Sequence, residues 1–150
     1  GADEFQDLFV SVDCPESNIL ANAGVPYRCS NVGGCVIPLW SHIAYQVNLS
    51  WNQNGNCALV VGATCPDELC KVRRLVGDLP ILIPGIGAQG GDLEKTVKMG
   101  KDKRGKGIIV NSSRGIIFAS SEPDFAEAAR RETEKLHNLI NQYRKEEVKS

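Results

Sequence analysis

Short apolar runs alternate with longer segments of helical periodicity along most of this chain. The runs at residues 57–61, 81–83 and 107–110 are continuous and only a few residues long, which is typical of strands buried on both faces of a parallel sheet. Between and after them, apolar residues recur every three or four positions, as they do on the inner face of a helix. Strands that alternate with helices in this way predict a parallel α/β fold.

Four segments carry the helical pattern. One begins at Pro38, one occupies residues 66–76, a short one covers residues 93–99, and the last extends to Tyr143. The expected inner faces are Leu39, Ile43, Val47 and Trp51 in the first, Leu69, Val72 and Val76 in the second, and Phe125, Ala129, Leu136, Ile140 and Tyr143 in the last. The basic residues of the second segment, Lys71, Arg73 and Arg74, are expected on its exposed face.

The first 37 residues lack such a pattern. Proline and glycine interrupt residues 13–37 repeatedly, and most side chains there are small or polar, so no regular element is expected in that stretch. An unstructured connection of this length is unusual within a compact domain. We therefore divide the chain into an irregular lead and insertion at residues 1–37, to which no register is assigned, and a series of β/α units at residues 38–150.

A glycine-rich loop follows the strand expected at residues 81–83. Gly85, Gly87, Gly90 and Gly91 fall within one short stretch, and Asp92 then opens a helical segment. Glycines let a backbone turn tightly and come close to a ligand, and the first amides of a helix are unsatisfied donors at the positive end of its dipole. This arrangement predicts a binding site for a phosphate group.

The next strand end carries a second loop of the same kind. Residues 111–115 read Asn-Ser-Ser-Arg-Gly, and the guanidinium of Arg114 can hold phosphate oxygens in a bidentate manner. Two consecutive loops suited to phosphate are what a (β/α)8 barrel builds after its last two strands. Because the expected strands are fewer than the eight that close such a barrel, the predicted fold is the C-terminal part of a (β/α)8 TIM barrel.

Composition and charge exclude several other classes of protein. A formal net charge of -1 indicates neither a nucleic-acid partner nor an anionic membrane surface, and no apolar run approaches the roughly 18 residues of a membrane span.

The six cysteines form no Cys-x-x-Cys pair, so no metal site is expected and most should be free thiols. A cytoplasmic protein is predicted. Because Met99 is its one methionine, the chain is expected to be cut, processed or excerpted.

Three strand-end motifs together resemble those of orotidine 5'-phosphate decarboxylase. They are Val-Val-Gly-Ala-Thr at 60–64, Pro-Gly-Ile-Gly-Ala-Gln-Gly-Gly-Asp at 84–92 and Asn-Ser-Ser-Arg-Gly-Ile at 111–116. Residues 125–129 are similar to the terminal helix of the longer bacterial type. The resemblance implies a lyase without cofactor or metal ion, which converts orotidine 5'-phosphate to uridine 5'-phosphate (UMP) and carbon dioxide in pyrimidine biosynthesis, within a dimeric barrel.

The resemblance also implies roles for five residues. Arg114 would pair with the substrate phosphate beside the amide of Ser113. Gln89 would contact the phosphate and bridge to the loop that covers the pyrimidine, and Gly87 and Ala88 would shape the gripping loop. All five belong to the two strand-end loops that the residue pattern itself assigns to phosphate.

The catalytic motif of that family, Asp-x-Lys-x-x-Asp, is absent from this chain. Residues 102–106 resemble it superficially, but they supply no second acid, Lys106 being basic, and they precede the last strand. This stretch is more simply a solvated turn. We therefore expect no catalytic residue in this chain, which alone would be inactive; a homodimer or the missing half of the barrel would complete it.

Two other functions stay open at this point. The chain could be a non-catalytic nucleotide-phosphate-binding or assembly subunit derived from the enzyme. Gly85, Gly87 and Gly90 also satisfy the Gly-x-Gly-x-x-Gly spacing of an NAD-type dinucleotide-binding domain. That domain needs an acid about 20 residues further on, at the end of the next strand, where this chain has Val110 and Asn111. The dinucleotide alternative is therefore the weaker one.

Overall fold

The computed structural model describes residues 8–13, 17–29, 33–87 and 89–146. The chain divides into two compact units, Gly1–Cys57 with Lys71–Leu79 and Ala58–Cys70 with Pro80–Ser150. Helix α4 (Pro66–Val76) begins in the second unit and ends in the first. In the described part of the chain, no helix is both long and apolar enough to cross a membrane.

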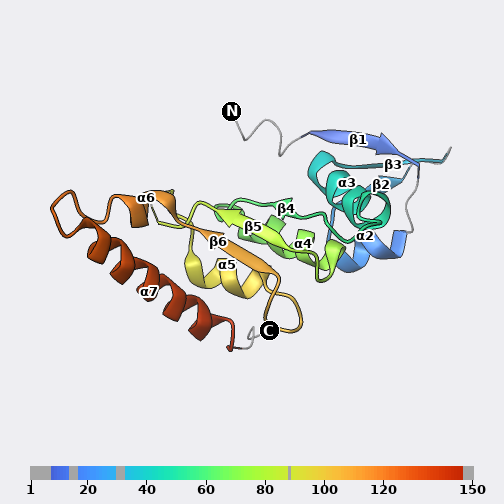
Figure 1. Cartoon of the computed structure of the whole chain (residues 1–150). Coiled ribbons are helices and arrows are strands. Elements are labelled where there is room, and N and C mark those ends of the chain that lie inside the picture. The colour runs from blue at the N-terminus through green and yellow to red at the C-terminus, as the bar shows by residue number, and fades with distance from the viewer. Residues whose placement is uncertain (1–7, 14–16, 30–32, 88, 147–150) are drawn as a thin grey trace. The chain divides into compact units, whose positions relative to one another are not determined.

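The first unit contains an antiparallel sheet (Figure 1). The elements of this unit, besides the end of α4, are β1 (Phe9–Val12), α2 (Ser17–Ala23), β2 (Arg28–Cys29), β3 (Cys35–Pro38), α3 (Leu39–Gln46) and the π-helical η1 (Val47–Trp51). The strand order is β1-β3-β2. The central strand β3 therefore pairs with β1 on one side and with the two-residue β2 on the other.

The expectation that residues 13–37 contain no regular element is wrong. Helix α2 and strand β2 fall within this stretch, and β3 begins in it. In β3, Cys35 and Ile37 are fully buried whereas Val36 between them is exposed, which is the period-two pattern of a half-buried sheet. Strands of two and four residues are too short for this alternation to stand out among prolines and glycines. The division of the chain at residue 37 stays a prediction.

The helical stripe expected in residues 39–51 is only partly buried. Val47 is buried as predicted, but Ile43 and Trp51 are exposed, and Ser41 and Ala44 are buried instead. Ser41 is accommodated in the interior because its hydroxyl donates to the carbonyl of Pro38 at 2.7 Å. A buried polar group with a partner costs little, so the helix can turn its smaller residues inward.

Two further side chains differ from their expected positions. Phe125, expected on the inner face of the terminal helix, is exposed, and Ala128 is buried in its place. Arg73 is buried, not exposed, because its guanidinium donates to the carbonyls of Gly77 and Leu79, both at 2.7 Å. Arg73 thus satisfies carbonyl groups just beyond the end of α4, where a cation is also favoured by the helix dipole.

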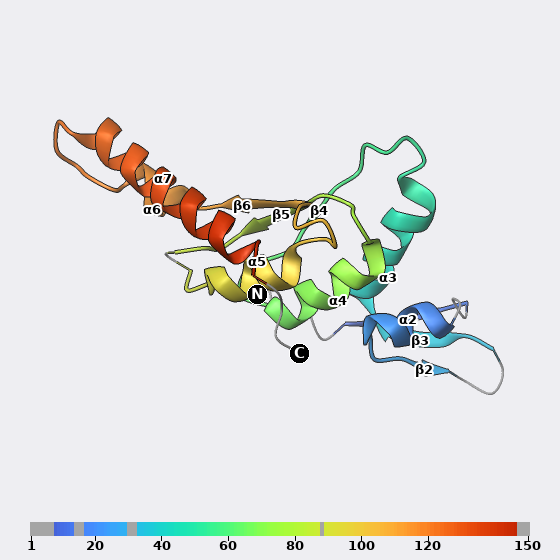
Figure 2. The ribbon, with the colours of Figure 1, turned by 90° about the horizontal axis from the view of Figure 1, so that it is seen from below.

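The second unit is built on a parallel sheet with the order β4-β5-β6. Its elements are β4 (Leu59–Val60), the start of α4, β5 (Ile81–Pro84), α5 (Leu93–Gly100), β6 (Ile108–Asn111), α6 (Ser113–Ile117) and α7 (Phe125–Tyr143). Figures 1 and 2 show α5 against one face of the sheet, and α7 packs against α5 and α6. The prediction of parallel strands alternating with helices is confirmed, and the short α6 is an additional element.

One face of this parallel sheet is covered and the other is open. Ile81 and Ile83 of β5 are fully buried on the side of α5, where a Cβ atom on Gly100 would lie only 2.9 Å from Ile83 Cδ1. On the opposite face, Val60 is 67% and Ile109 57% exposed. The apolar runs predict strands buried on both faces, and this prediction is therefore wrong for the described part of the chain. Its elements cover one side of the sheet only.

The loop between α5 and β6 is organised by a buried carboxylate. Asp102, 7% exposed, accepts hydrogen bonds from the amides of Arg104 and Lys106 at 2.8 Å and from the Arg104 guanidinium at 2.8 and 3.0 Å. Burial raises the pKa of Asp102, but the hydrogen bonds from Lys106 and Arg104 outweigh burial and hold the pKa below its ordinary value. The expected turn is present and Lys103, Arg104 and Lys106 are exposed as in a solvated turn, but Asp102 is buried and holds the turn together.

Replacing Asp102 by Ala should lower the free energy of unfolding by about 1–3 kcal/mol, because two amides of the loop lose their acceptor. Urea unfolding at neutral pH measures the loss. A group whose folded pKa is depressed stabilises above its ordinary pKa, about 3.9 for Asp, and this contribution disappears as the pH falls through the folded value. The difference between wild type and Asp102→Ala should therefore shrink in acid. Equal losses for Asp102→Ala and for the exposed neighbour Lys103→Ala would contradict this role.

Candidate functional site

The glycine-rich loop after β5 folds back on itself. Gly85, Gly87 and Gly90 have φ angles of 106°, 85° and 78°, in the left-handed region that side chains with a Cβ atom disfavour. The amide of Gly90 donates to the carbonyl of Gly87 at 2.8 Å, and that of Gly91 donates to the carbonyl of Gly85 at 3.1 Å. These bonds close the loop into a compact turn at the carboxyl end of β5.

Gly91 brings this loop against the end of the neighbouring strand. A Cβ atom at position 91 would lie 2.6 Å from Ala63 Cβ and 2.7 Å from the carbonyl oxygen of Gly85. The amide of Ala63 in turn donates to the carbonyl of Pro84 at 2.8 Å. The loops after β4 and β5 therefore touch at a point where only a glycine fits.

The loop after β6 is joined to the same turn. The hydroxyl of Ser112 donates to the carbonyl of Ile86 at 3.3 Å, and the side-chain amide of Asn111 donates to the hydroxyl of Ser113 at 3.2 Å. Helix α6 begins at Ser113, so the first amides of this short helix lie at the same end of the sheet. The two phosphate-type loops of the sequence analysis are neighbours in space.

A small cavity of about 100 Å³ lies between these two loops. It is lined by Pro84, Gly85, Ile86, Gln89, Asn111, Ser113 and Arg114. Of the five residues predicted for the site, the structure thus brings together Gln89, Ser113 and Arg114. Gly87 belongs to the same loop but does not line the cavity, and Ala88 lies outside the described residues.

The side chains at this cavity can donate hydrogen bonds to an anion. The Arg114 guanidinium is exposed, and within the described part of the chain no hydrogen bond or ion pair holds its side chain. Its fork of N–H groups fits two oxygens of a phosphate or carboxylate. The Gln89 amide and the Ser113 hydroxyl add neutral donors. The arrangement is chemically suited to hold a small tetrahedral anion.

The start of α5 contributes less than the sequence suggests. The carboxylate of Asp92 caps this helix by accepting the amide of Lys95 at 3.0 Å. That amide is therefore satisfied within the chain, and the negative charge of Asp92 sits where the expected phosphate would benefit from the helix dipole. The possible donors that line the cavity are Gln89, in the loop before α5, and Ser113 and Arg114 of α6, a short helix that the residue pattern did not predict.

The superficial match to the catalytic motif lies at the other end of the sheet. Asp102 precedes β6, whereas Gln89, Ser113 and Arg114 follow the carboxyl ends of β5 and β6. Its carboxylate is also occupied by Arg104 and Lys106. Among the described residues, no group of three or more His, Cys, Asp and Glu side chains is arranged to hold a metal ion.

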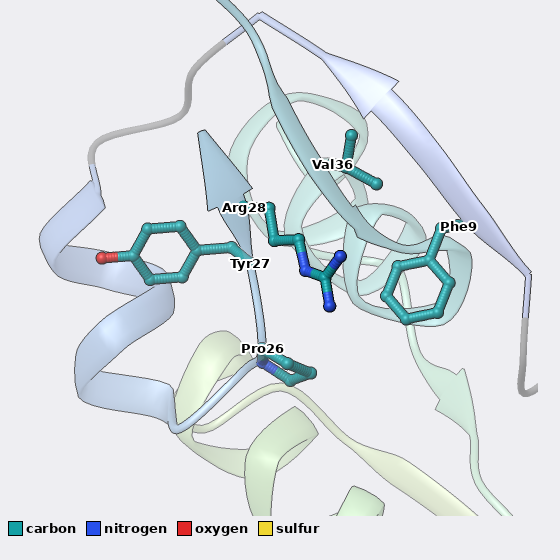
Figure 3. A pocket seen from close by; sticks show the side chains of 5 residues that line it. All are labelled: Phe9, Pro26, Tyr27, Arg28 and Val36. Atoms are coloured by element: carbon teal, nitrogen blue, oxygen red, sulfur yellow. The ribbon is translucent and has the colours of Figure 1, made fainter. Parts of the chain in front are cut away.

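A second cavity, of about 320 Å³, lies in the first unit and was not foreseen from the sequence (Figure 3). It is lined by Phe9, Pro26, Tyr27, Arg28 and Val36. Figure 3 shows the Arg28 side chain pointing toward the side of the Phe9 ring, while the ring of Tyr27 points to the opposite side. This cavity offers one cation on an apolar surface and lacks the converging donors of the loops after β5 and β6.

Substituting Gly91 by Ala should disrupt the loops after β4 and β5, because the new methyl group would overlap Ala63 and the Gly85 carbonyl. We expect a loss of about 1–3 kcal/mol in the free energy of unfolding, as for other overpacked sites. Gly62→Ala is the matched control, since a Cβ atom there meets only Thr64 Oγ1 at 3.6 Å. Thermal unfolding of both variants measures the effect, and equal melting temperatures would rule out the close approach at Gly91.

Comparison with known proteins finds curated relatives that match most of this chain. No family model matches it. The curated orotidine 5'-phosphate decarboxylase of Janthinobacterium sp. (strain Marseille) is 50% identical over 124 residues, which are 77% of this chain and 46% of that protein. The protein of the same name from Aromatoleum aromaticum is 46% identical over 141 residues, 94% of this chain and 51% of the relative. The chain spans about half the length of these curated relatives.

Solved structures with related names are also similar to this chain. The structure of Leishmania donovani UMP synthase matches with a TM-score of 0.63 and 34% identity, over 89% of this chain and 26% of that one. The structure of Leishmania donovani OMP decarboxylase matches with a TM-score of 0.61 and 34% identity, over 79% of this chain and 42% of that one. The parallel sheet and its helices are part of a TIM barrel, as predicted. Most of this chain is thus homologous to a C-terminal portion, about half in length, of the curated orotidine 5'-phosphate decarboxylases.

Proposed function

We propose that this chain is the phosphate-gripping portion of an enzyme that decarboxylates orotidine 5'-phosphate to UMP in pyrimidine biosynthesis. The observation that carries the proposal is the convergence of Gln89, Ser113 and Arg114 on one cavity, at the carboxyl ends of adjacent parallel strands. Active sites of (β/α)8 barrels lie at that end of the sheet. The names of the curated relatives support the same activity.

In this proposal each of the five predicted residues has a separate role. Arg114 pairs with two oxygens of the substrate phosphate, and the amide of Ser113 donates to the phosphate beside it. Gln89 contacts the phosphate and bridges to the loop that covers the pyrimidine. Gly87 and Ala88 shape the loop that brings Gln89 there. The hydrogen bonds from Gly90 to Gly87 and from Gly91 to Gly85 support this assignment, because they close the loop that carries Gln89.

The contribution of this chain to catalysis would be binding energy. The phosphate is remote from the carboxylate that leaves as carbon dioxide, and its interactions can hold the pyrimidine in place and favour loop closure. The Asp-x-Lys-x-x-Asp motif, which would supply the proton donor and its flanking acids, is not in this sequence. We therefore assign no catalytic residue to this chain and propose that it is inactive alone. The proposed reaction uses neither a cofactor nor a metal ion.

The open face of the parallel sheet supports completion of the barrel by further strands. Val60 and Ile109 are largely exposed on that face, and β4 and β6 are edge strands in the described part of the chain. Exposed apolar edge strands are unfavourable in a stable monomer. We propose that the missing part of the barrel, or a second subunit of a homodimer, covers them. The relatives' biosynthetic role is the basis for proposing a cytoplasmic location.

A non-catalytic nucleotide-phosphate-binding or assembly subunit is the second candidate. It is favoured by one observation, namely that the phosphate-type cavity is present in a sequence that lacks the catalytic motif. The two candidates predict the same contacts to phosphate and differ only in turnover. The NAD-type alternative has less support, because Asn111 at the end of β6 hydrogen bonds Ser113 and is not the acid that would hold a ribose.

Replacing Arg114 by Ala should weaken UMP binding by about 1–3 kcal/mol, the range of hydrogen bonds to charged groups. Calorimetric titration with UMP measures the loss, and titration with uridine, which lacks the phosphate, should show none. Arg130→Ala removes an exposed arginine of α7 that pairs with Glu134 and serves as the control. Equal UMP affinities of the Arg114→Ala and Arg130→Ala proteins would remove Arg114 from the site.

A further inference from the structure

Two cysteines face each other in the antiparallel sheet of the first unit. Cys29 ends β2 and Cys35 begins β3, and the register pairs them directly. Directly opposed residues of an antiparallel pair have Cα atoms about 4.5–5.5 Å apart, and a disulfide requires roughly 4.4–6.8 Å. The backbone of this sheet therefore already holds the two residues at a distance that a disulfide can bridge.

The two cysteines differ sharply in their access to solvent. Opposed residues project from the same side of a sheet, and on the other side the next pair is Arg28 and Val36, which line the cavity of Figure 3. Cys29 is exposed, whereas Cys35 is fully buried. An oxidant from solvent can therefore reach Cys29, whereas the buried Cys35 lies opposite it, in position to react with an oxidised Cys29. This is the relation between an attacking and a resolving cysteine.

We propose that Cys29 and Cys35 form a reversible disulfide by exchange with a low-molecular-weight disulfide such as oxidised glutathione. The Cys29 thiolate attacks one sulfur of glutathione disulfide, so that a Cys29–glutathione bond forms and the first glutathione thiolate leaves. The Cys35 thiolate then attacks the Cys29 sulfur, forming the Cys29–Cys35 bond and releasing the second glutathione. Two cysteine thiols are oxidised and one glutathione disulfide is reduced to two thiols, with the protons exchanged with water.

The disulfide would attach the short edge strand β2 covalently to the rest of the sheet. β2 has two residues and lies at the edge, where its only strand partner in the described part of the chain is β3. A covalent link from Cys29 to Cys35 would hold β2 to the central strand. Arg28 and Val36 are next to the two cysteines in sequence, so the same link would fix two walls of the cavity in Figure 3. This inference is independent of the proposed decarboxylase function.

Peptide mapping of the oxidised protein tests the proposal. The full chain is incubated with oxidised glutathione, remaining thiols are blocked with N-ethylmaleimide, and chymotrypsin then cuts after Tyr27 and Trp40. The resulting peptide, residues 28–40, contains Cys29 and Cys35 and no other cysteine. We expect this peptide about 2 Da lighter than its reduced form and free of maleimide. Dithiothreitol before blocking should restore two maleimide groups.

Matched variants and a denatured sample test whether the native fold, and not a chance encounter, brings Cys29 and Cys35 together. Cys35→Ser should retain a glutathione adduct on Cys29, because the resolving thiol is gone, and Cys65→Ser should leave the disulfide intact. In strong denaturant the pair should form more slowly and in competition with other cysteines. A wild-type peptide 28–40 that carries two maleimide groups or a lasting glutathione adduct, a link from either cysteine to Cys14, or equal rates with and without denaturant would overturn the proposal.

Discussion

The hydrogen-bonded register of the three parallel strands is the constraint on which the candidate site depends. β5 pairs with β4 from Leu59↔Ile81 and with β6 from Ile81↔Ile108. Because the strands point the same way, their carboxyl ends meet at one edge of the sheet and their loops become neighbours. Residues 89 and 114, far apart in sequence, thereby line the same cavity. A change of register at β5 would separate the glycine-rich loop from Arg114.

Close packing at that edge limits which residues can build the loops. Gly91 allows the turn to touch Ala63, and Ser112 ties the loop after β6 to Ile86. At the opposite end of the sheet, Asp102 gathers the amides that lead into β6. The second unit is therefore organised at both ends of its strands by short-range contacts, while Val60 and Ile109 leave one face uncovered. The same sheet both forms the site and requires completion.

The sequence predicted most of this second unit because its signals are local and strong. Continuous apolar runs located β5 and β6, and the glycines with Asp92 located the loop and the start of α5. Arg114 was placed at the site by its position after a strand. The sequence could not reveal that Arg73 and Asp102 are buried, because long-range packing decides the burial of charged side chains. The short strands of the first unit gave too few residues for a periodic signal.

Reconstitution of the barrel from two portions tests the central claim most directly. This chain would be mixed with an N-terminal portion of the Janthinobacterium relative, and conversion of orotidine 5'-phosphate to UMP would be measured. The C-terminal portion of that relative, combined with the same partner, is the positive control. We expect neither portion to turn over substrate alone and the mixture to do so. An inactive mixture beside an active control would contradict the account and leave this chain as a binding protein without a catalytic role.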